Sequence, residues 1–153
     1  MVPPKPRRYY PIGLDITDRE CLVVGGGRVA ERKVMRLLAY GAKVTVVSPE
    51  LTPSLKKWAR QDMFCHQKKK FSNDILREQF LVFALTDDLS VNRRIACEAR
   101  KKNILANVAK PGGASAFILP AVLRRPSFSI AVSTEGRSPR TAKRIREKLK
   151  KIL

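Results

Sequence analysis

The chain has 153 residues, of which 44% are hydrophobic, and it carries a formal net charge of +19. That length suits one domain or one domain with a short appendage, and that hydrophobic content argues against a disordered chain. No apolar run approaches the ~20 residues that cross a bilayer, and the basic amino terminus lacks the hydrophobic stretch of a signal peptide. Three widely spaced cysteines (Cys21, Cys65 and Cys97) favour neither a disulfide scaffold nor a zinc site, so we expect a cytoplasmic protein without a metal centre.

Apolar runs alternate with helix-like segments from residue 20 to residue 108, after a proline-rich basic arm at 1–8 that we expect to be flexible. Strands are predicted at 22–24, 44–47, 81–85 and 104–108, with a weaker one at 64–71. Helices are predicted between the first two strands, at 53–61 and after Thr86-Asp87-Asp88. This alternation predicts an α/β fold, a Rossmann-like doubly wound parallel sheet.

The pattern changes after Val108. Residues 128–132 predict a weak strand, and Ser138-Pro139 predicts the start of a terminal helix. An apolar stripe runs along that helix through Ile145, Leu149, Ile152 and Leu153, while basic residues cover its other faces. Such a helix needs a surface to dock on, and we expect a partner subunit to supply it.

The most informative motif is a glycine turn between the first predicted strand and the helix that follows it. Gly25, Gly27 and Ala30 have the G-x-G-x-x-A spacing of a dinucleotide site, and apolar runs flank them at βαβ spacing. Glycines let the backbone approach a pyrophosphate, and the amides that open the helix point at its charge. We therefore favour dinucleotide binding over a purely structural turn.

Polar residues follow two other predicted strands, at the edge where ligands bind in open α/β sheets. After the second strand, Ser48 can hydrogen bond to a ribose, while Glu50 stands two residues beyond the usual acidic position. The absence of an aspartate weakens the usual argument for NAD over NADP, and it does not reverse that argument, because no arginine stands at this point. After the fourth strand, Asp87 is expected to cap a helix and face the cofactor, whereas for Thr86 alone we favour a helix cap.

The charge of +19 has three interpretations, namely nucleic-acid binding, solubility and a small polyanionic ligand, and composition does not separate them. His66 is the single histidine, and no neighbouring residue suggests a metal cluster or a catalytic pair.

A set of motifs in order along the chain carries a family resemblance over about residues 9–150. The motifs are Tyr10-Pro11-Ile12, CLVVGGGRVAERK at 21–33, 41–50, Leu85-Thr86-Asp87-Asp88 with Asn92, Asn107-Val108, Phe117-Ile118-Leu119-Pro120 and STEGRSP at 133–139. Together they resemble the amino-terminal module of siroheme synthase, the precorrin-2 dehydrogenase and sirohydrochlorin ferrochelatase family.

This resemblance implies an enzyme that uses NAD to oxidise precorrin-2 to sirohydrochlorin in siroheme biosynthesis. It implies cofactor contacts by Gly25, Gly27, Arg28 and Val29 at the phosphates, and by Pro49 and Glu50, with Ser48 beside them, near the adenosine. Thr86 and Asp87 complete the expected cofactor site. The family fold also implies an NAD-binding domain at 9–112 and a dimerisation segment at 113–153 that ends in the basic helix, hence a homodimer.

The resemblance also implies where the tetrapyrrole binds. Thr134 occupies a position that is close to the tetrapyrrole in the family, and we assign Arg137 and Ser138 of the same element to substrate binding with it. A polycarboxylate substrate explains the positive charge, because a basic crevice raises its local concentration. Nucleic acid therefore ranks below it.

The sequence departs from the family at one position that matters for chemistry. Lys110 stands where the family carries an aspartate held to be the acid/base group, and a lysine replaces a carboxylate base only if its pKa falls far. The catalytic residue is therefore left open, with Asp87 as one alternative. The leading hypothesis is a precorrin-2 dehydrogenase, the second is a catalytically degenerate subunit or carrier that binds NAD and tetrapyrrole, and ferrochelatase activity ranks below dehydrogenation.

Overall fold

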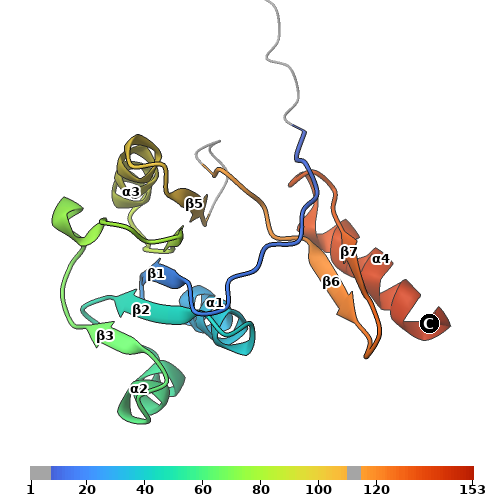
Figure 1. The fold of residues 1–153 in the computed structure, drawn as a ribbon, viewed down its shortest axis with the longest axis horizontal. Coiled ribbons are helices and arrows are strands. Elements are labelled where there is room, and N and C mark those ends of the chain that lie inside the picture. The colour runs from blue at the N-terminus through green and yellow to red at the C-terminus, as the bar shows by residue number, and fades with distance from the viewer. Residues whose placement is uncertain (1–7, 110–114) are drawn as a thin grey trace, which may run out of the picture. The chain divides into compact units, whose positions relative to one another are not determined.

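A parallel sheet forms the centre of the larger unit, Gly13–Ala116, in the computed structural model, which describes residues 8–109 and 115–153 (Figure 1). Its five strands lie in the order β3-β2-β1-β4-β5. They are β1 Glu20–Val24, β2 Lys43–Val47, β3 Cys65–Gln67, β4 Leu81–Ala84 and β5 Leu105–Val108. The strand order reverses between β1 and β4, which both pair in parallel, so the predicted Rossmann-like doubly wound sheet is confirmed.

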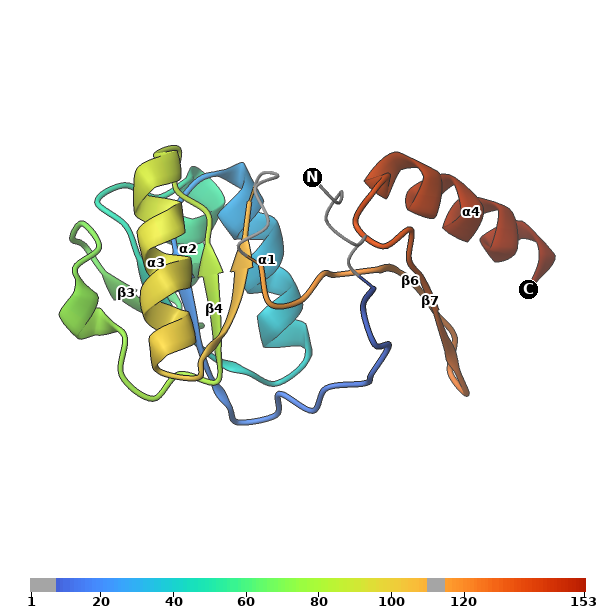
Figure 2. The same cartoon turned by 90° about the horizontal axis from the view of Figure 1, so that it is seen from above.

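Helices cover both faces of this sheet, with α1 (Arg28–Ala39) and α2 (Pro53–Arg60) on one face and α3 (Leu89–Lys101) on the other (Figures 1 and 2). Because both faces are covered, β1 and β4 are apolar and buried along nearly their whole length. The connection from β3 to β4 holds only a 3-10 turn, η1 (Asn73–Ile75). No helix in the described part of the chain is long and apolar enough to cross a membrane.

The predicted strand at 64–71 is wrong in extent, because β3 ends at Gln67 and the following lysines, Lys68 to Lys70, are exposed. Among the strands that the structure describes, β3 pairs only with β2 and lies at the edge of the sheet, so few neighbours stabilise a longer strand. The helix predicted at 53–61 is confirmed as α2, which begins after Thr52 with Pro53 in its first turn.

The smaller unit combines residues 8–12 with Phe117–Leu153. Two antiparallel strands, β6 (Ala121–Arg124) and β7 (Ser129–Val132), form a hairpin on which α4 (Pro139–Ile152) packs. The predicted strand at 128–132 and the terminal helix are confirmed, whereas β6 was not predicted. Of the apolar positions on α4, Ala142 is buried, while Ile145 is 39% and Ile152 78% exposed.

Candidate functional site

The glycine turn lies at the point where the strand order reverses, and its first glycine is required by the fold itself. Gly25 has a φ of +122°, a conformation that side chains rarely adopt. A Cβ there would stand 2.5 Å from the carbonyl oxygen of Leu85, just after β4. The Gly25 amide donates to the carbonyl of Val47, at the end of β2, over 2.9 Å. Gly25 therefore lets the ends of three neighbouring strands meet.

The second glycine is required by the segment that follows β2. A Cβ on Gly26 would stand 1.9 Å from the carbonyl oxygen of Glu50, which no small shift relieves. The Gly26 carbonyl accepts from the Thr52 amide over 3.0 Å. The Thr52 hydroxyl in turn donates to the carboxylate of Glu31 in the first turn of α1. The turn is thus held in place from both α1 and the start of α2.

The third glycine is different, because none of the described residues 8–109 and 115–153 requires a glycine there. Gly27 is the N-cap of α1, with φ −84° and ψ −175°, values open to any residue. Within the described part of the chain, a Cβ there would meet no atom within 4 Å and no side chain caps α1. The exposed residues Arg28 and Val29 follow it. The first-turn amides of α1 therefore have no side-chain partner among the described residues, and such amides can hold a phosphate.

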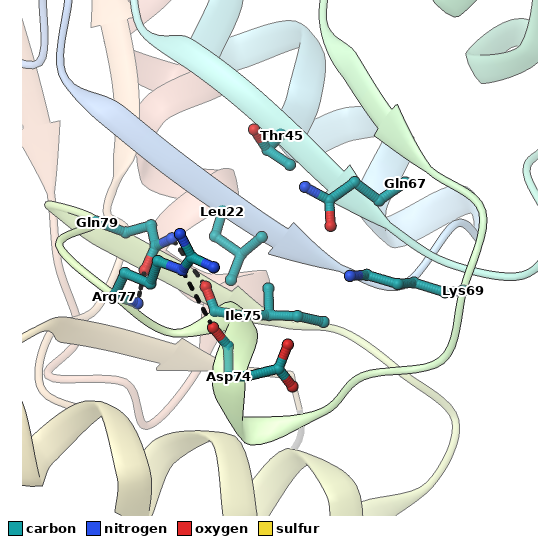
Figure 3. Close-up of a pocket in the computed structure, with 8 residues that line it drawn as sticks. All are labelled: Leu22, Thr45, Gln67, Lys69, Asp74, Ile75, Arg77 and Gln79. Carbon is teal, nitrogen blue, oxygen red and sulfur yellow. Dashed lines mark hydrogen bonds between the residues drawn. The ribbon is translucent and has the colours of Figure 1, made fainter.

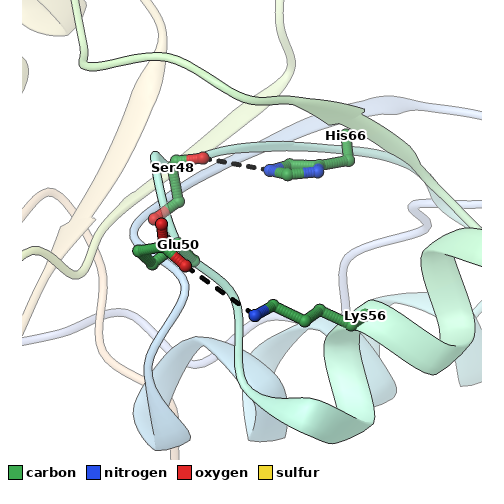
Figure 4. Close-up of polar contacts among 4 residues, drawn as sticks. All are labelled: Ser48, Glu50, Lys56 and His66. Carbon is green, nitrogen blue, oxygen red and sulfur yellow. Dashed lines mark hydrogen bonds and ion pairs between the residues drawn. The ribbon is translucent and has the colours of Figure 1, made fainter.

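Backbone contacts order the segment after β2 where the adenosine half of a dinucleotide would bind (Figure 4). Ser48 is buried, and its hydroxyl donates to the carbonyl of Glu50 over 2.7 Å. Nε2 of His66, on β3, lies 3.0 Å from the Ser48 carbonyl oxygen. The Glu50 side chain is 80% exposed and lies 3.7 Å from the Nζ of Lys56. Ser48 and His66 thus shape the loop, while Glu50 presents a carboxylate to solvent.

The loop after β4 is built around a buried amide. Asn92 is fully buried on α3; its Oδ1 accepts from the Thr86 amide over 3.0 Å, and its Nδ2 donates to the Thr86 carbonyl over 2.8 Å. Asp88 caps α3, since its carboxylate accepts from the amides of Ser90 and Val91. Hydrogen bonds to that carboxylate from Ser90 and Val91 lower the pKa of Asp88. The predicted helix caps at Thr86 and Asp87 are therefore wrong, because Asp88 takes that role and Thr86 pairs with Asn92.

In the smaller unit, the expected substrate residues form the turn that begins α4. The Thr134 hydroxyl accepts from the Ser138 amide and donates to the Ser138 carbonyl, each over 3.0 Å. The Ser138 hydroxyl accepts from the Thr141 amide as the N-cap of α4. Between them, Glu135 has a φ of +54° and accepts from the Tyr9 amide, and Arg137 is exposed. The two hydroxyls hold the turn, and Arg137 is its exposed charge.

Two family models match the chain, one described as putative NAD(P)-binding over residues 12–121 and one as sirohaem biosynthesis protein central over 127–152. A solved structure, SirC, a precorrin-2 dehydrogenase, is 32% identical and superposes with a TM-score of 0.84, covering 95% of this chain and 71% of SirC. The chain belongs to the precorrin-2 dehydrogenase family. The resemblance inferred from the motifs is confirmed, and a nicotinamide dinucleotide is the cofactor class of the family.

Curated relatives in this family are longer than the chain. A siroheme synthase of Salmonella dublin is 39% identical over 145 residues, which is 95% of this chain and 32% of the relative. Siroheme synthase 2 of Yersinia pestis bv. Antiqua is also 39% identical over 145 residues, 31% of its length. The chain thus spans about a third of the length of these relatives.

The expected cofactor residues lie at the carboxyl edge of the sheet, in the glycine turn and in the loops after β2 and β4. Lys110, which stands at the expected position of the acid/base group, lies outside the described residues. Asp87 follows β4 at the same edge and is exposed. Among residues 8–109 and 115–153, no cluster of histidine, cysteine and acidic side chains is arranged to hold a metal ion. Which group moves a proton therefore stays a prediction.

Sequence reasoning missed Lys33, a half-buried lysine on α1. Its Nζ lies 5.9 Å from the ring centroid of Phe83 on β4. Burial, followed by the nearby charges of Arg36 and Arg32, lowers the pKa of Lys33 to about 8. The sequence held a sign of this burial, because Lys33 lies between Ala30 and Val34, two residues of α1 that face the core.

The Lys33→Met variant is expected to be more stable than the parent at pH 7, by about 1 kcal/mol after allowance for screening of a partly exposed group. Lys33 has a lower pKa folded than unfolded, so between pH 8 and 10.5 the unfolded chain binds more protons and the parent gains stability as pH rises. The advantage of the variant should therefore shrink by pH 10. Urea unfolding at both pH values measures it. An equal advantage at both would contradict the prediction, and Lys57→Met, at an exposed position, is the control.

Proposed function

We propose that the chain binds NAD at the glycine turn and oxidises precorrin-2 to sirohydrochlorin in siroheme biosynthesis. The observation that carries the proposal is Gly27, a glycine that no contact with the described residues requires. It stands at the start of α1, which no described side chain caps, where the strand order of the sheet reverses. Family membership supplies the reaction, since the solved relative SirC is a precorrin-2 dehydrogenase.

Different residues would bind the phosphates and the adenosine of the dinucleotide. The amides of Arg28 and Val29, at the start of α1, would hold the phosphates. Pro49 and Glu50 would lie along the adenosine, and the exposed Glu50 carboxylate suits ribose hydroxyls while repelling a 2′-phosphate, which favours NAD over NADP. When bound, NAD supplies the hydride acceptor. The chain's own contribution is then to position both molecules at the carboxyl edge of the sheet.

The substrate would be attracted by the smaller unit. Phe117–Leu153 contains ten lysine and arginine residues and two acidic residues. Such a surface raises the local concentration of a polycarboxylate tetrapyrrole, and an exposed arginine such as Arg137 can pair with a carboxylate through two hydrogen bonds. Thr134 and Ser138 would act by holding the turn that presents Arg137.

A homodimer completes the proposal. Ile145, Ile152 and Leu153 of the α4 stripe are 39%, 78% and 55% exposed in the single chain. Apolar side chains that lie along one helix in this way favour association, and we assign residues 113–153 to the dimer contact. Sedimentation of the purified chain measures the association.

The activity is tested by mixing the purified chain with precorrin-2 and NAD and following the absorbance of sirohydrochlorin. We expect an increase that requires both the chain and NAD, and a slower one with NADP. No increase over a sample with NAD alone would exclude the enzymatic proposal. Equal rates with NAD and NADP would exclude the role given to Glu50.

The second candidate, a subunit that binds NAD and tetrapyrrole without catalysis, is favoured by one residue of the sequence, Lys110. If the chain is an active dehydrogenase, Lys110→Asp should leave dehydrogenation unchanged or lower it, and any gain should appear in iron insertion instead. A general base contributes about 10²- to 10⁴-fold, so a rise in dehydrogenation of that size would instead identify the parent as a degenerate site. The paired assays are sirohydrochlorin formation and siroheme formation with ferrous iron.

A further inference from the structure

A polar concavity of about 270 Å³ opens in the larger unit, on the face of the sheet that carries α3 (Figure 3). Leu22 on β1 and Ile75 of η1 form its apolar floor, while Thr45 on β2 and Gln67 on β3 form one wall. Arg77, which follows η1, stands on the opposite side. None of these residues belongs to the glycine turn or to the two loops that follow β2 and β4.

The concavity exists because the connection from β3 to β4 contains a 3-10 turn in place of an α-helix. Phe71, Ile75 and Leu76 of this connection join the same core as α3, so it crosses on the α3 face. Only η1 occupies the place where a doubly wound sheet normally carries a crossover helix. Thr45 and Gln67 are therefore half-buried rather than covered.

The side that carries Arg77 is fixed by its own hydrogen bonds. The Arg77 amide donates to Oε1 of Gln79 over 2.8 Å, and Nε2 of Gln79 donates to the Ile75 carbonyl over 3.0 Å. Nε of Arg77 donates to the Asp74 carbonyl over 3.4 Å. These contacts leave the outer end of the guanidinium directed across the concavity, toward the ammonium of Lys69 on the far side (Figure 3).

We propose that this concavity binds a small dicarboxylate, with one carboxylate on Arg77 and the other on Lys69. A guanidinium matches a carboxylate with two parallel hydrogen bonds, and an ammonium takes the second carboxylate as a point charge. Between them, the Thr45 hydroxyl and the Gln67 amide supply uncharged donors. The volume admits a chain of a few carbon atoms above the floor of Leu22 and Ile75.

One residue that lines the concavity should repel a dicarboxylate, so its removal should strengthen binding rather than weaken it. Asp74 lines the concavity, and hydrogen bonds from the Ser72 hydroxyl and its own backbone lower the pKa of its carboxyl, so it carries a negative charge near neutral pH. Removing that charge should tighten dicarboxylate binding, whereas a structural role for the concavity predicts no change.

Calorimetric titration of the full chain with succinate and with glutarate, in the absence of NAD and tetrapyrrole, tests the proposal. We expect saturable binding of at least one of them below about 10 mM, weakened at least about tenfold by Arg77→Gln and by Lys69→Gln. Lys68→Gln, at the adjacent exposed position outside the concavity, is the matched control and should stay within about twofold of the parent. Asp74→Asn should bind more tightly than the parent.

Four outcomes would overturn the proposal. They are no saturable binding, equal binding of acetate and sulfate, equal loss with Lys68→Gln and Lys69→Gln, and displacement of the dicarboxylate by NAD. Circular dichroism of each variant separates lost binding from lost folding. NAD is added only in the competition experiment. Because neither cofactor nor tetrapyrrole is present in the direct titration, failure of that titration leaves the dehydrogenase proposal untouched, and the reverse also holds.

Discussion

Gly27→Asp should abolish NAD binding while making the fold more stable. An aspartate at an N-cap accepts hydrogen bonds from the first-turn amides, and the space for its Cβ is open, so the free energy of unfolding should rise by about 0.5–1 kcal/mol. The same carboxylate would occupy the phosphate position and repel the pyrophosphate. We expect NAD affinity, measured by calorimetry, to fall at least about 100-fold, or about 2.7 kcal/mol.

The matched control is Gly26→Ala, one residue earlier in the same turn. Its Cβ would stand 1.9 Å from the Glu50 carbonyl oxygen, so the fold has to shift, and we expect a loss of stability above about 3 kcal/mol. Neighbouring glycines should thus give opposite changes in thermal unfolding. Retained NAD affinity in a folded Gly27→Asp protein would show that the cofactor does not use the start of α1.

These opposite roles mark the limit of what the sequence predicts about the site. The G-x-G-x-x-A spacing predicted the turn, the helix and the ligand class, because spacing along the chain determines local backbone geometry. It treated Gly25 and Gly27 alike. What separates them is Leu85, which crowds Gly25 as Glu50 crowds Gly26. Both residues are distant in sequence and come close only when β1, β2 and β4 pair.

The fold was predicted best where burial is uniform. The apolar runs at 22–24, 44–47 and 81–85 correspond to the three central strands, because a strand that is covered on both faces is apolar along nearly its whole length. β6 was missed because Ala121–Arg124 is short and its burial depends on α4, which follows it by fifteen residues. A hairpin stabilised by a later helix leaves little periodicity of its own.

Hydroxyl groups show a second limit of sequence reasoning at this site. Ser48 and Thr134 were assigned to ligands because of their motifs, and both side chains also make hydrogen bonds inside their loops. A hydroxyl can position a loop and still lie beside a ligand, so motif membership does not separate the two roles. Asn92 shows the converse, since it was named only as part of a motif and holds the whole turn after β4.

Asn92→Leu should be among the most destabilising single changes in the larger unit. Leucine has a similar size and keeps α3 apolar, so the change mainly removes hydrogen bonds rather than creating a cavity. It leaves the amide and the carbonyl of Thr86 without the partners they have in the parent. An unpaired group in a buried setting costs more than a hydrogen bond contributes, and we expect a loss of about 3 kcal/mol in urea unfolding.

Thr86→Val is the matched control, because it removes the hydroxyl that bonds to Oδ1 of Asn92 over 2.8 Å and keeps both backbone contacts. Its cost should be about 1 kcal/mol. If the loop after β4 forms one wall of the cofactor crevice, Asn92→Leu should also weaken NAD binding at temperatures where the protein is still folded. Equal costs for the two variants would mean that the backbone of Thr86 finds other partners, and that the turn after β4 does not depend on the amide of α3.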